Sequence, residues 1–440
     1  MKERILIIGS GAREHAIADA LARSPQEPEL LCFSGARNPG IAELCDAYGI
    51  GNISDASAVT TFAAEHNPTM AVIGPEAPLA VGVADALWAA GIPVVGPIRE
   101  LARLESSKSF TRELLAKYEI PGNPFFQRFM SMDGVEAVLA RFPNQHVIKD
   151  DGLAGGKGVK VCGDHLHSLE DSLTFCRELV EHGHSFVIEE KLEGEEFSLL
   201  CFCDGHTLAD MPLVQDHKRA FNGDEGPNTG GMGSYTDADH KLPFVTDDDL
   251  RMSRNMNKLV VAAVEKECGR PYQGILYGGF MATKNGVKLI EYNARFGDPE
   301  CLNLLTLLET GFVAICRAIV DRTLADLAIV FVPRASVCKY IVPEGYPDAP
   351  RKGDVVELPS QLPPNVTLYL GAVDVQDGQL VATGSRTVAV VATAATIAEA
   401  ERLCESVAAQ IPGRFFHRTD IGTAALIDRR VEHMKTLRSV

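Results

Sequence analysis

A run of glycines between two lysines is the first part of the sequence whose residue types could handle phosphate. Lys149 is followed by Gly152, Gly155, Gly156, Lys157 and Gly158. Glycines let the backbone fold closely around a ligand, and lysine ammonium groups neutralise phosphate charge. The spacing is not that of a P-loop, because three residues separate Gly152 from Gly156 and glycine follows Lys157. A solvated glycine hairpin is the alternative interpretation.

Acidic residues end the next apolar run. Glu189 and Glu190 stand at its end, and Glu195 lies close behind them. Carboxylates beside a buried strand could accept hydrogen bonds from ribose hydroxyls or from adenine. For the neighbouring Glu193 and Glu196, a solvated acidic turn is the better interpretation.

A basic segment precedes a second glycine-rich stretch. Asp216 and Lys218 belong to the sequence Gln-Asp-His-Lys-Arg, and glycine recurs from 226 to 233 around Asn228. This combination is typical of an anion-binding lid, with disorder as the alternative, and the Pro, Asn and Thr among the glycines favour a defined closing loop. We expect residues 221–233, part of a long loop from 215 to 235, to be mobile without ligand and ordered over bound substrates.

Oxygen ligands for a metal alternate near residue 290. On a strand, Glu291 and Asn293 would face the same side, about 7 Å apart. Hard oxygen ligands suit Mg²⁺. Arg295 is placed to contact a phosphate or a carboxylate bidentately. The Asn-Gly pair at 285–286 predicts a hairpin that fixes the register, and Gln273, just before this hairpin, is a candidate outer ligand.

A glycine turn follows the first apolar run of the chain. Gly9 and Gly11 precede Arg13 and Glu14, so backbone N–H groups at a helix start could hold a phosphate. The turn lacks a full dinucleotide fingerprint, because Glu14 occupies the third glycine position and Ser34 stands where an acid should hold a ribose. A nicotinamide dehydrogenase is therefore disfavoured, and a tight strand-to-helix turn is an equally good interpretation.

Three segments with different patterns must position these groups. Residues 1–104 alternate short apolar runs with amphipathic stretches, which predicts a parallel sheet covered by helices. Residues 105–325 form a central region, and residues 326–440 are predicted to form a small α+β domain. Turns follow the apolar runs of the first segment, and ligands of open parallel sheets bind at the carboxyl ends of strands.

The composition limits the partners of the chain. The 440 residues carry a net charge of −17, from 42 Lys and Arg against 59 Asp and Glu, which disfavours binding to nucleic acid or to anionic lipid. No charge-free apolar stretch reaches the roughly 18 residues that a membrane span needs. The 11 cysteines show no zinc spacing and are expected to be reduced core thiols of a cytoplasmic protein.

The order of these groups resembles the ATP-grasp fold, in which two α+β subdomains hold Mg-ATP between them. Over nearly the whole chain, the amino-acid sequence is similar to the successive motifs of the phosphoribosylamine–glycine ligase family. The similar motifs are GSGAREH at 9–15, NPG at 38–40, GPEAPL at 74–79, SSKSFTRELL at 106–115, QDHKR at 215–219, GPNTGGMG at 226–233, NARFGDPE at 293–300 and DIG at 420–422.

The resemblance implies three domains and one reaction. The domains are an N-terminal Rossmann-like parallel α/β domain, a central ATP-grasp domain whose small lid subdomain spans about 121–190, and a small C-terminal α+β domain. The reaction is the ATP-dependent joining of glycine to 5-phosphoribosylamine in purine synthesis, with Mg²⁺ or Mn²⁺ as cofactor.

The resemblance also implies residue roles. Those for ATP are Lys108, Lys149, Gly155, Gly156, Lys157, Gly158, Glu189, Glu190 and Glu195. The catalytic residues are Asp216, Lys218 and Arg295, and the metal ligands are Glu291, Asn293 and Gln273. Those for the other substrates are Gly9, Gly11, Arg13, Glu14, Asn38, Gly40, Pro75, Glu76, Asn228, Gly230, Gly231, Gly297 and Asp298.

Two positions depart from the family pattern, and other functions stay open. Asp150 and Gly155 both stand where the family usually has alanine, and an extra carboxylate beside a phosphate-binding lysine would weaken ATP binding or hold a further cation. The alternatives are another ATP-grasp ligase or a carboxylase of purine synthesis and, from another class, a nucleotide-binding regulator without catalysis. We expect a monomer whose partners are ATP, glycine and phosphoribosylamine, without nucleic acid or membrane.

Overall fold

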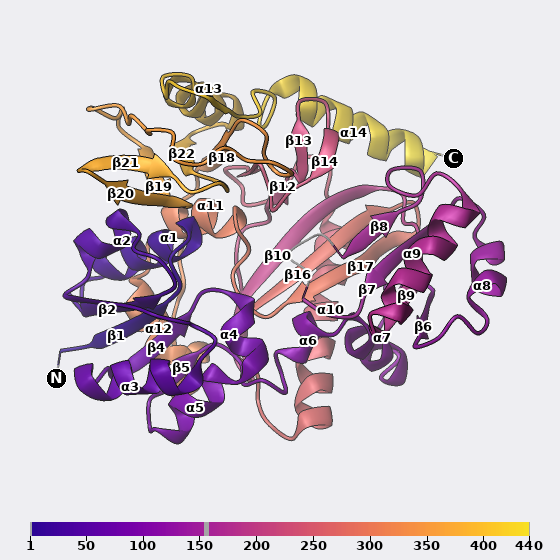
Figure 1. The fold of residues 1–440 in the computed structure, drawn as a ribbon, viewed down its shortest axis with the longest axis horizontal. Coiled ribbons are helices and arrows are strands. Elements are labelled where there is room, and N and C mark those ends of the chain that lie inside the picture. Colours follow the sequence, from indigo (N-terminus) through magenta and orange to yellow (C-terminus); the bar gives the residue numbers. More distant parts are fainter. Residues whose placement is uncertain (1, 154–157, 440) are drawn as a thin grey trace.

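The computed structural model describes residues 2–153 and 158–439 and begins with a five-stranded parallel sheet in the order β3-β2-β1-β4-β5 (Figure 1). The strands are β1 (Arg4–Ile8), β2 (Glu29–Ser34), β3 (Ala47–Ile50), β4 (Met70–Ile73) and β5 (Val94–Val95). The first helices are α1 (Ala12–Ala22), α2 (Pro39–Leu44), α3 (Ala56–His66), α4 (Glu76–Val81) and α5 (Val83–Ala89). The strand order reverses between β1 and β4, and ligands of such sheets bind at this switch point.

Both faces of this sheet are covered, as its nearly continuous apolar strands require. Ile5 and Ile7 pack on one face with α1 and with two helices from later in the chain, α11 (Glu300–Leu307) and α12 (Phe312–Asp321). Leu6 and Ile8 pack on the other face with α3 and α5. The predicted N-terminal parallel α/β domain is therefore confirmed.

The central region contains two antiparallel sheets. The larger has the order β11-β10-β16-β17 and the smaller the order β6-β9-β7-β8. The larger sheet consists of β10 (Glu195–Asp204), β11 (Leu208–Asp210), β16 (Gln273–Thr283) and β17 (Gly286–Asn293), with α6 (Arg103–Ser106), α7 (Lys108–Lys117) and α10 (Asp247–Cys268) beside it. The smaller consists of β6 (Phe126–Phe129), β7 (His146–Asp150), β8 (Val159–Val161) and β9 (Phe186–Glu190), with α8 (Val135–Arg141) and α9 (Leu169–Glu181).

The last sheet joins distant parts of the chain in the order β12-β15-β18-β22-β19. Its strands are β12 (Gln215–Asp216), β15 (Gly233–Thr236), β18 (Ala335–Pro343), β19 (Val366–Leu370) and β22 (Val388–Ala394), and β23 (Phe415–Phe416) also pairs with β18. The remaining elements are the hairpins β13 (Arg219–Phe221) with β14 (Glu225–Asn228) and β20 (Val373–Gln376) with β21 (Gln379–Ala382), a 3₁₀ turn η1 (Leu324–Asp326), and the helices α13 (Ile397–Ala408) and α14 (Ala424–Ser439).

The segment 215–235 differs from its prediction as a long irregular loop. It forms β12, the hairpin β13–β14 and the start of β15. The physical reason is long-range pairing, because β15 pairs with β18 from Gly233↔Lys339 to Thr236↔Ser336. The central region thus donates two strands to a sheet whose other strands follow residue 334.

Within the described ranges 2–153 and 158–439, none of the helices is long and apolar enough to cross a membrane. The cysteines carry free thiols and most of them are buried, as expected for core positions.

Candidate active site

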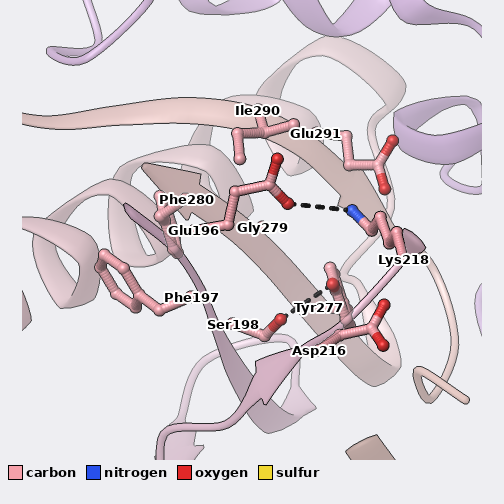
Figure 2. A pocket seen from close by; sticks show the side chains of 10 residues that line it. All are labelled: Glu196, Phe197, Ser198, Asp216, Lys218, Tyr277, Gly279, Phe280, Ile290 and Glu291. Atoms are coloured by element: carbon pink, nitrogen blue, oxygen red, sulfur yellow. Dashed lines mark hydrogen bonds and ion pairs between the residues drawn. The ribbon is translucent and has the colours of Figure 1, made fainter. Parts of the chain in front are cut away.

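A pocket lies where β10, β12, β16 and β17 meet, and Figure 2 shows the side chains that line it. They belong to Glu196, Phe197, Ser198, Asp216, Lys218, Tyr277, Gly279, Phe280, Ile290 and Glu291. Phe197 and Phe280 belong to the buried hydrophobic core beside the pocket, while the ammonium of Lys218 points toward the side that carries Glu196 and Glu291 (Figure 2).

Lys218 is held in its charged form by neighbouring carboxylates. Its Nζ lies 3.3 Å from Oε2 of Glu196. The negative charges of Glu196 and Glu291 raise the pKa of Lys218 well above its ordinary value. Burial opposes the ionisation of Glu291, but Lys218, Lys149 and Lys108 together lower its pKa. Cations from several segments therefore converge on one carboxylate, as they would on a phosphate.

The pKa of Asp216 is shifted in the opposite direction from that of Glu291. Burial and the charge of Glu300 raise the pKa of Asp216 well above its ordinary value. The Oε1 atom of Glu300 accepts hydrogen bonds from Ser198 Oγ at 3.2 Å and from the Tyr277 hydroxyl at 2.9 Å. A carboxyl that retains its proton beside a lysine suits acid–base chemistry.

The two predicted metal ligands, Glu291 and Asn293, lie side by side on β17. Glu291 pairs across the sheet with Gly279 and Asn293 with Tyr277, and Asn293 Nδ2 donates to Glu291 Oε1 at 3.5 Å. An ionised carboxylate and an amide oxygen are donors that fit Mg²⁺, which usually takes its other ligands from phosphate and water. No group of three His, Cys, Asp or Glu residues in the described part of the chain is arranged to hold a metal by itself.

The structure does not bring Gln273 to this metal site. Gln273 lies at the far end of β16, where it pairs with Asp204, and its Nε2 donates to the carbonyl of Ile319 at 2.8 Å. A strand advances about 3.4 Å per residue, so the six positions between Gln273 and Gly279 carry it far from Glu291. Its assignment as an outer ligand is not supported.

Lys149 and Glu189 form a buried ion cluster with Arg112. Glu189 accepts from Arg112 Nε at 2.7 Å, and its Oε2 lies 2.8 Å from Lys149 Nζ. Burial opposes its ionisation, but Arg112 and Lys149 lower the pKa of Glu189 to about 2. Lys149 also donates to the carbonyl of Ile290 at 3.1 Å, next to Glu291. In this structure Glu189 therefore orients Lys149. The sequence had predicted that Glu189 contacts the nucleoside of ATP.

The base of the first glycine run is fastened to α7. Lys108 Nζ donates to the carbonyl of Gly152 at 2.6 Å, and Gly158 accepts from the backbone N–H of Asp150 at 2.8 Å. Gly155, Gly156 and Lys157 lie outside the described residues. Asp150, the departure from the family pattern, has a partner of its own, His184, whose Nδ1 is 3.1 Å away.

The other two predicted ATP carboxylates have partners within the chain. Glu190 Oε1 accepts from the backbone N–H of Phe125 at 2.9 Å. Glu195 contacts α14 through His433 Nδ1 at 2.6 Å and Arg430 Nε at 3.2 Å. Successive residues of a strand face opposite sides. Glu196, predicted to be a solvated turn residue, therefore lines the pocket, and Glu195 faces away from it.

Arg295 joins the central region to the N-terminal domain. Its NH2 group lies 2.7 Å from Glu105 Oε1, and its Nε lies 3.5 Å from Glu76 Oε2. Burial opposes ionisation of Glu76, but Arg295 and Arg13 lower its pKa. Arg13 NH1 in turn donates to the carbonyl of Phe296 at 3.3 Å. Arg295 therefore pairs with Glu76 at the domain boundary, and Arg13, which pairs with Glu14, lies close enough to lower the same pKa.

Glu14 occupies the space between the two predicted turns at the switch point. Its Oε2 accepts from the Gly11 N–H at 2.6 Å, and its Oε1 accepts from Arg13 Nε at 2.6 Å. Gly9 has φ of +120°, and a Cβ there would lie 2.7 Å from Glu14 Cγ and 3.0 Å from Pro75 Cδ. The turn after β1 thus approaches the turn after β4, as the predicted site requires.

Asn38 and Gly40 serve packing in this structure. Asn38 Oδ1 caps α2 by accepting from Gly40 N–H at 3.0 Å, and its Nδ2 donates to the carbonyls of Ser10 at 2.9 Å and Leu370 at 2.7 Å. A Cβ at Gly40 would lie 2.1 Å from His15 Cε1. Both residues hold the first turn against the C-terminal domain.

Arg386 forms hydrogen bonds or an ion pair with three further predicted substrate residues, Gly230, Gly231 and Asp298. Its NH1 group donates to the carbonyls of Gly230 at 2.6 Å, Gly231 at 3.3 Å and Asp298 at 2.7 Å. Its NH2 group lies 3.0 Å from Asp298 Oδ2. A Cβ at Gly297 would lie 2.4 Å from Glu300 Oε2, which explains a glycine there.

Asn228 lies nearby on β14, where it pairs with Arg219 of β13. It belongs to the hairpin rather than to the lining of the pocket.

Sequence reasoning missed four residues that organise these clusters. Arg112 lies in a recognised motif, but its buried partner Glu189 is 77 positions away. Glu105 and Arg386 lie outside the motifs that carried the prediction, and Glu196 was assigned to solvent. For Glu196 a signal was present, because strand alternation makes only one of two adjacent glutamates face Lys218.

Three sequence-family profiles match successive parts of the chain. They are described as phosphoribosylglycinamide synthetase N domain (residues 3–105), ATP-grasp (A) domain (106–301) and C domain (336–424).

Curated relatives match along their full length. A phosphoribosylamine–glycine ligase of Methanocella arvoryzae is 48% identical over 438 residues, which cover 99% of this chain and 100% of the relative. One of Methanosarcina barkeri is 46% identical over 435 residues, with 99% and 100% covered.

Solved structures show the same architecture. The crystal structure of phosphoribosylamine–glycine ligase from Thermotoga maritima has a TM-score of 0.80 at 30% identity and covers 95% of this chain and 100% of its own. The biotin carboxylase domain of Hydrogenobacter thermophilus 2-oxoglutarate carboxylase, solved with MgADP, has a TM-score of 0.70 at 14% identity, with 98% and 94% covered. The second likeness shows the fold alone.

Proposed function

The chain belongs to the phosphoribosylglycinamide synthetase family, and we propose that its site joins glycine to 5-phosphoribosylamine while ATP is converted to ADP and phosphate. It is an ATP-dependent ligase of purine synthesis, and the product is phosphoribosylglycinamide. The observation that carries the assignment of the site is the pocket that Asp216, Lys218 and Glu291 line together, with Lys149 bonded to the carbonyl of Ile290 beside Glu291.

A carboxylate is a poor electrophile, so the reaction needs activation. The glycine carboxylate attacks the γ-phosphoryl group of ATP, which gives glycyl phosphate and ADP. The amine of phosphoribosylamine then attacks the carbonyl carbon, phosphate leaves and the nitrogen loses a proton. No protein nucleophile is needed, so catalysis rests on positioning and charge neutralisation.

The lysines of the site carry the charge neutralisation. Lys149 and Lys108 contact the phosphates of ATP, and Glu189 with Arg112 holds Lys149 in place. Lys218 neutralises the charge that develops during phosphoryl transfer. Asp216, whose pKa is raised by burial and by Glu300, keeps its proton and donates a hydrogen bond to a phosphate oxygen, while the departing phosphate takes up the proton that the amine releases.

Glu291 and Asn293 would hold Mg²⁺ or Mn²⁺. Such an ion would neutralise part of the charge of the ATP phosphates. The role of this chain is to present an ionised carboxylate and an amide oxygen side by side on β17. The pKa of Glu291 is lowered by nearby lysines, which keeps its carboxylate charged at neutral pH.

The N-terminal domain binds phosphoribosylamine. Backbone N–H groups of the turn at 9–11, together with Arg13 and Arg295, form the cationic side of the boundary between the first two domains. Gly230, Gly231 and Asp298 are gathered by Arg386 on the adjoining side. An anionic phosphate on the ribose suits a site with these arginines.

The decisive experiment is ADP release with each substrate omitted in turn. We expect release only when ATP, glycine and phosphoribosylamine are all present. Turnover with bicarbonate or formate in place of glycine would identify a different ligase or a carboxylase. ATP binding without glycine-dependent turnover would identify a nucleotide-binding regulator. We also propose a cytoplasmic monomer without nucleic-acid or membrane partners, to be checked by sedimentation and fractionation.

A further inference from the structure

Residues 216–218, which carry Asp216 and Lys218, pack on the side away from the pocket against charged residues of the C-terminal segment. Asp216 and Lys218 face the pocket (Figure 2), and His217 between them is buried, at 2% exposure. Burial and the charge of Arg418 lower the pKa of His217 to about 3, so its ring is neutral. Neither ring nitrogen has a hydrogen-bond partner within the described residues. The neutral imidazole thus packs between the segment 216–218 and the side chains of Arg418 and Arg430.

Arg418 fastens the hairpin β13–β14 to the C-terminal segment. Its side chain is fully buried, and it lies 2.9 Å from Asp224 Oδ1 and 2.8 Å from Asp420 Oδ2. It also donates to the carbonyl of Arg219, at 3.2 Å, directly after Lys218. Asp420 accepts a further bond from the N–H of Gly223 at 2.9 Å. The turn and the base of the hairpin are therefore both tied to residues 418–420.

Arg430 of α14 bridges this hairpin to β10. It contacts Asp224, at the tip of the hairpin, and its Nε lies 3.2 Å from Oε2 of Glu195, the first residue of β10. Glu195 precedes Glu196, which pairs with Lys218 on the opposite side. One arginine thus connects β10, whose opposite face presents Glu196 to the pocket, with the turn of the hairpin that directly follows Lys218.

We propose that Arg430 is a positioning residue of the ligase, which sets the separation of Lys218 and Glu196 through Asp224 and Glu195. Helix α14 is itself anchored to the ATP-grasp region, since Arg438 lies 2.7 Å from Asp249 at the start of α10. The C-terminal helix is then part of the catalytic machinery and not only a cap on the fold. This inference rests on the proposed presence of Lys218 in the active site.

The chain offers a matched control beside Arg430. Arg429 is exposed on the next position of the same helix, so Arg429→Gln removes the same charge without touching the network. Arg430→Lys restores the charge at Arg430. His433→Gln weakens only the Glu195 end, from a side chain that is 41% exposed, and serves if Arg430→Gln fails to fold.

The test is a double-mutant cycle on kcat/KM for ADP release, with the melting temperature measured for each variant. We expect Arg430→Gln to lower kcat/KM about tenfold, with Arg430→Lys recovering only part of the loss, because one ammonium bridges two carboxylates less well than a guanidinium, and Arg429→Gln unchanged. Combined with Glu196→Gln, Arg430→Gln should add less than its separate effect, because both act on Lys218. His433→Gln should show a smaller effect with the same non-additivity.

Two results would overturn the inference. One is parental kcat/KM in Arg430→Gln. The other is full additivity with Glu196→Gln, which would reduce Arg430 to a structural role. A separate arm tests its premise: if Lys218→Ala keeps parental turnover, the site assignment fails, whereas loss of turnover in Lys218→Ala beside normal turnover in Arg430→Gln removes this inference alone.

Discussion

The contacts of Lys149 in the structure predict a specific effect when this residue is substituted. It is buried, and its partners Glu189 and Ile290 hold its ammonium beside Glu291. Lys149→Ala should slow turnover or weaken ATP binding at least about tenfold, because a charge-assisted contact to phosphate contributes about 1.5–3 kcal/mol. Steady-state kinetics and ATP titration measure the effect.

The fold should tolerate this change, since Glu189 keeps its bidentate contact with Arg112. Lys284→Ala, at an exposed turn, is the matched control and should behave as the parent enzyme. Parental kinetics in Lys149→Ala would place Lys149 outside the site.

Glu291 should dominate the metal requirement. Glu291→Gln removes the charged ligand and should raise the Mg²⁺ concentration needed for half-maximal ADP release and reduce turnover severely. Asn293→Ala should have a smaller effect, because water can replace a neutral ligand. Gln273→Ala should leave the Mg²⁺ dependence unchanged, since Gln273 is bonded to α12.

The measurement is ADP release against Mg²⁺ concentration for the three variants, with folding checked by circular dichroism. An unaltered Mg²⁺ dependence in Glu291→Gln would separate β17 from the metal. A raised requirement in Gln273→Ala would contradict its position at the far end of β16.

At residue scale, the sequence predicts which side chains are polar and adjacent, but not which of two neighbours faces inward. Glu291 and Asn293 were found because they are two positions apart on one strand. Glu195 and Glu196 are one position apart, and the side of the sheet that each faces depends on Lys218 and Arg430, which come from distant segments.

The hairpin β13–β14 is attached more firmly to the rest of the protein than its predicted mobility implies. It was expected to be part of a mobile lid, and it is tied to the C-terminal segment through Arg418 and through Asn222, whose Nδ2 donates to Thr419 Oγ1 at 2.7 Å. Whether it closes over substrates stays a prediction. The tethering implies that β13 and β14 are protected before any ligand binds.

Hydrogen exchange separates these expectations. Amides of β13 and β14 should show protection in the ligand-free enzyme, and ATP with both other substrates should increase protection mainly in the glycine-rich residues 229–232. The helix α3, on the outer face of the N-terminal sheet, serves as an internal reference. Equal protection of residues 221–233 with and without ligands would remove the lid interpretation.

Elements made by local sequence were predicted well, and elements made by distant pairing were not. The Asn-Gly pair at 285–286 predicted the β16–β17 hairpin because the turn and both strands are contiguous. β12 and β15 were not predicted because β15 is stabilised by pairing with β18, about a hundred residues later, and β12 by pairing with β15. Glycine-rich segments carry little strand signal of their own.

At the scale of the whole molecule, the predicted site residues are spread over three domains that contact one another around the pocket of the central region. Arg295 connects the central region to Glu76 and Glu105, and Asn38 connects the first turn to Leu370 of the C-terminal sheet. The sequence predicted the domains from their patterns, but such patterns say nothing about which surfaces face one another. Arg386 was missed for this reason.

Arg386 should be a substrate-affinity residue supplied by the C-terminal domain. Its guanidinium bonds Gly230, Gly231 and Asp298, and the charge of Asp298 outweighs burial and raises its pKa. Arg386→Lys keeps a charge but loses the planar fork that reaches several oxygens together. We expect the KM for phosphoribosylamine to rise about tenfold, with a smaller change in the KM for ATP, because the freed loops are proposed to bind the former.

Steady-state kinetics with each substrate varied in turn measure the two KM values. Arg402→Lys, on the exposed face of α13, is the control for a charge-preserving change in the same domain. A melting temperature close to that of the parent shows that the domains stay docked. If the KM for ATP rose as much as the KM for phosphoribosylamine, Arg386 would act on the docking of the domains, and residues 230, 231 and 298 would lose their assignment to phosphoribosylamine.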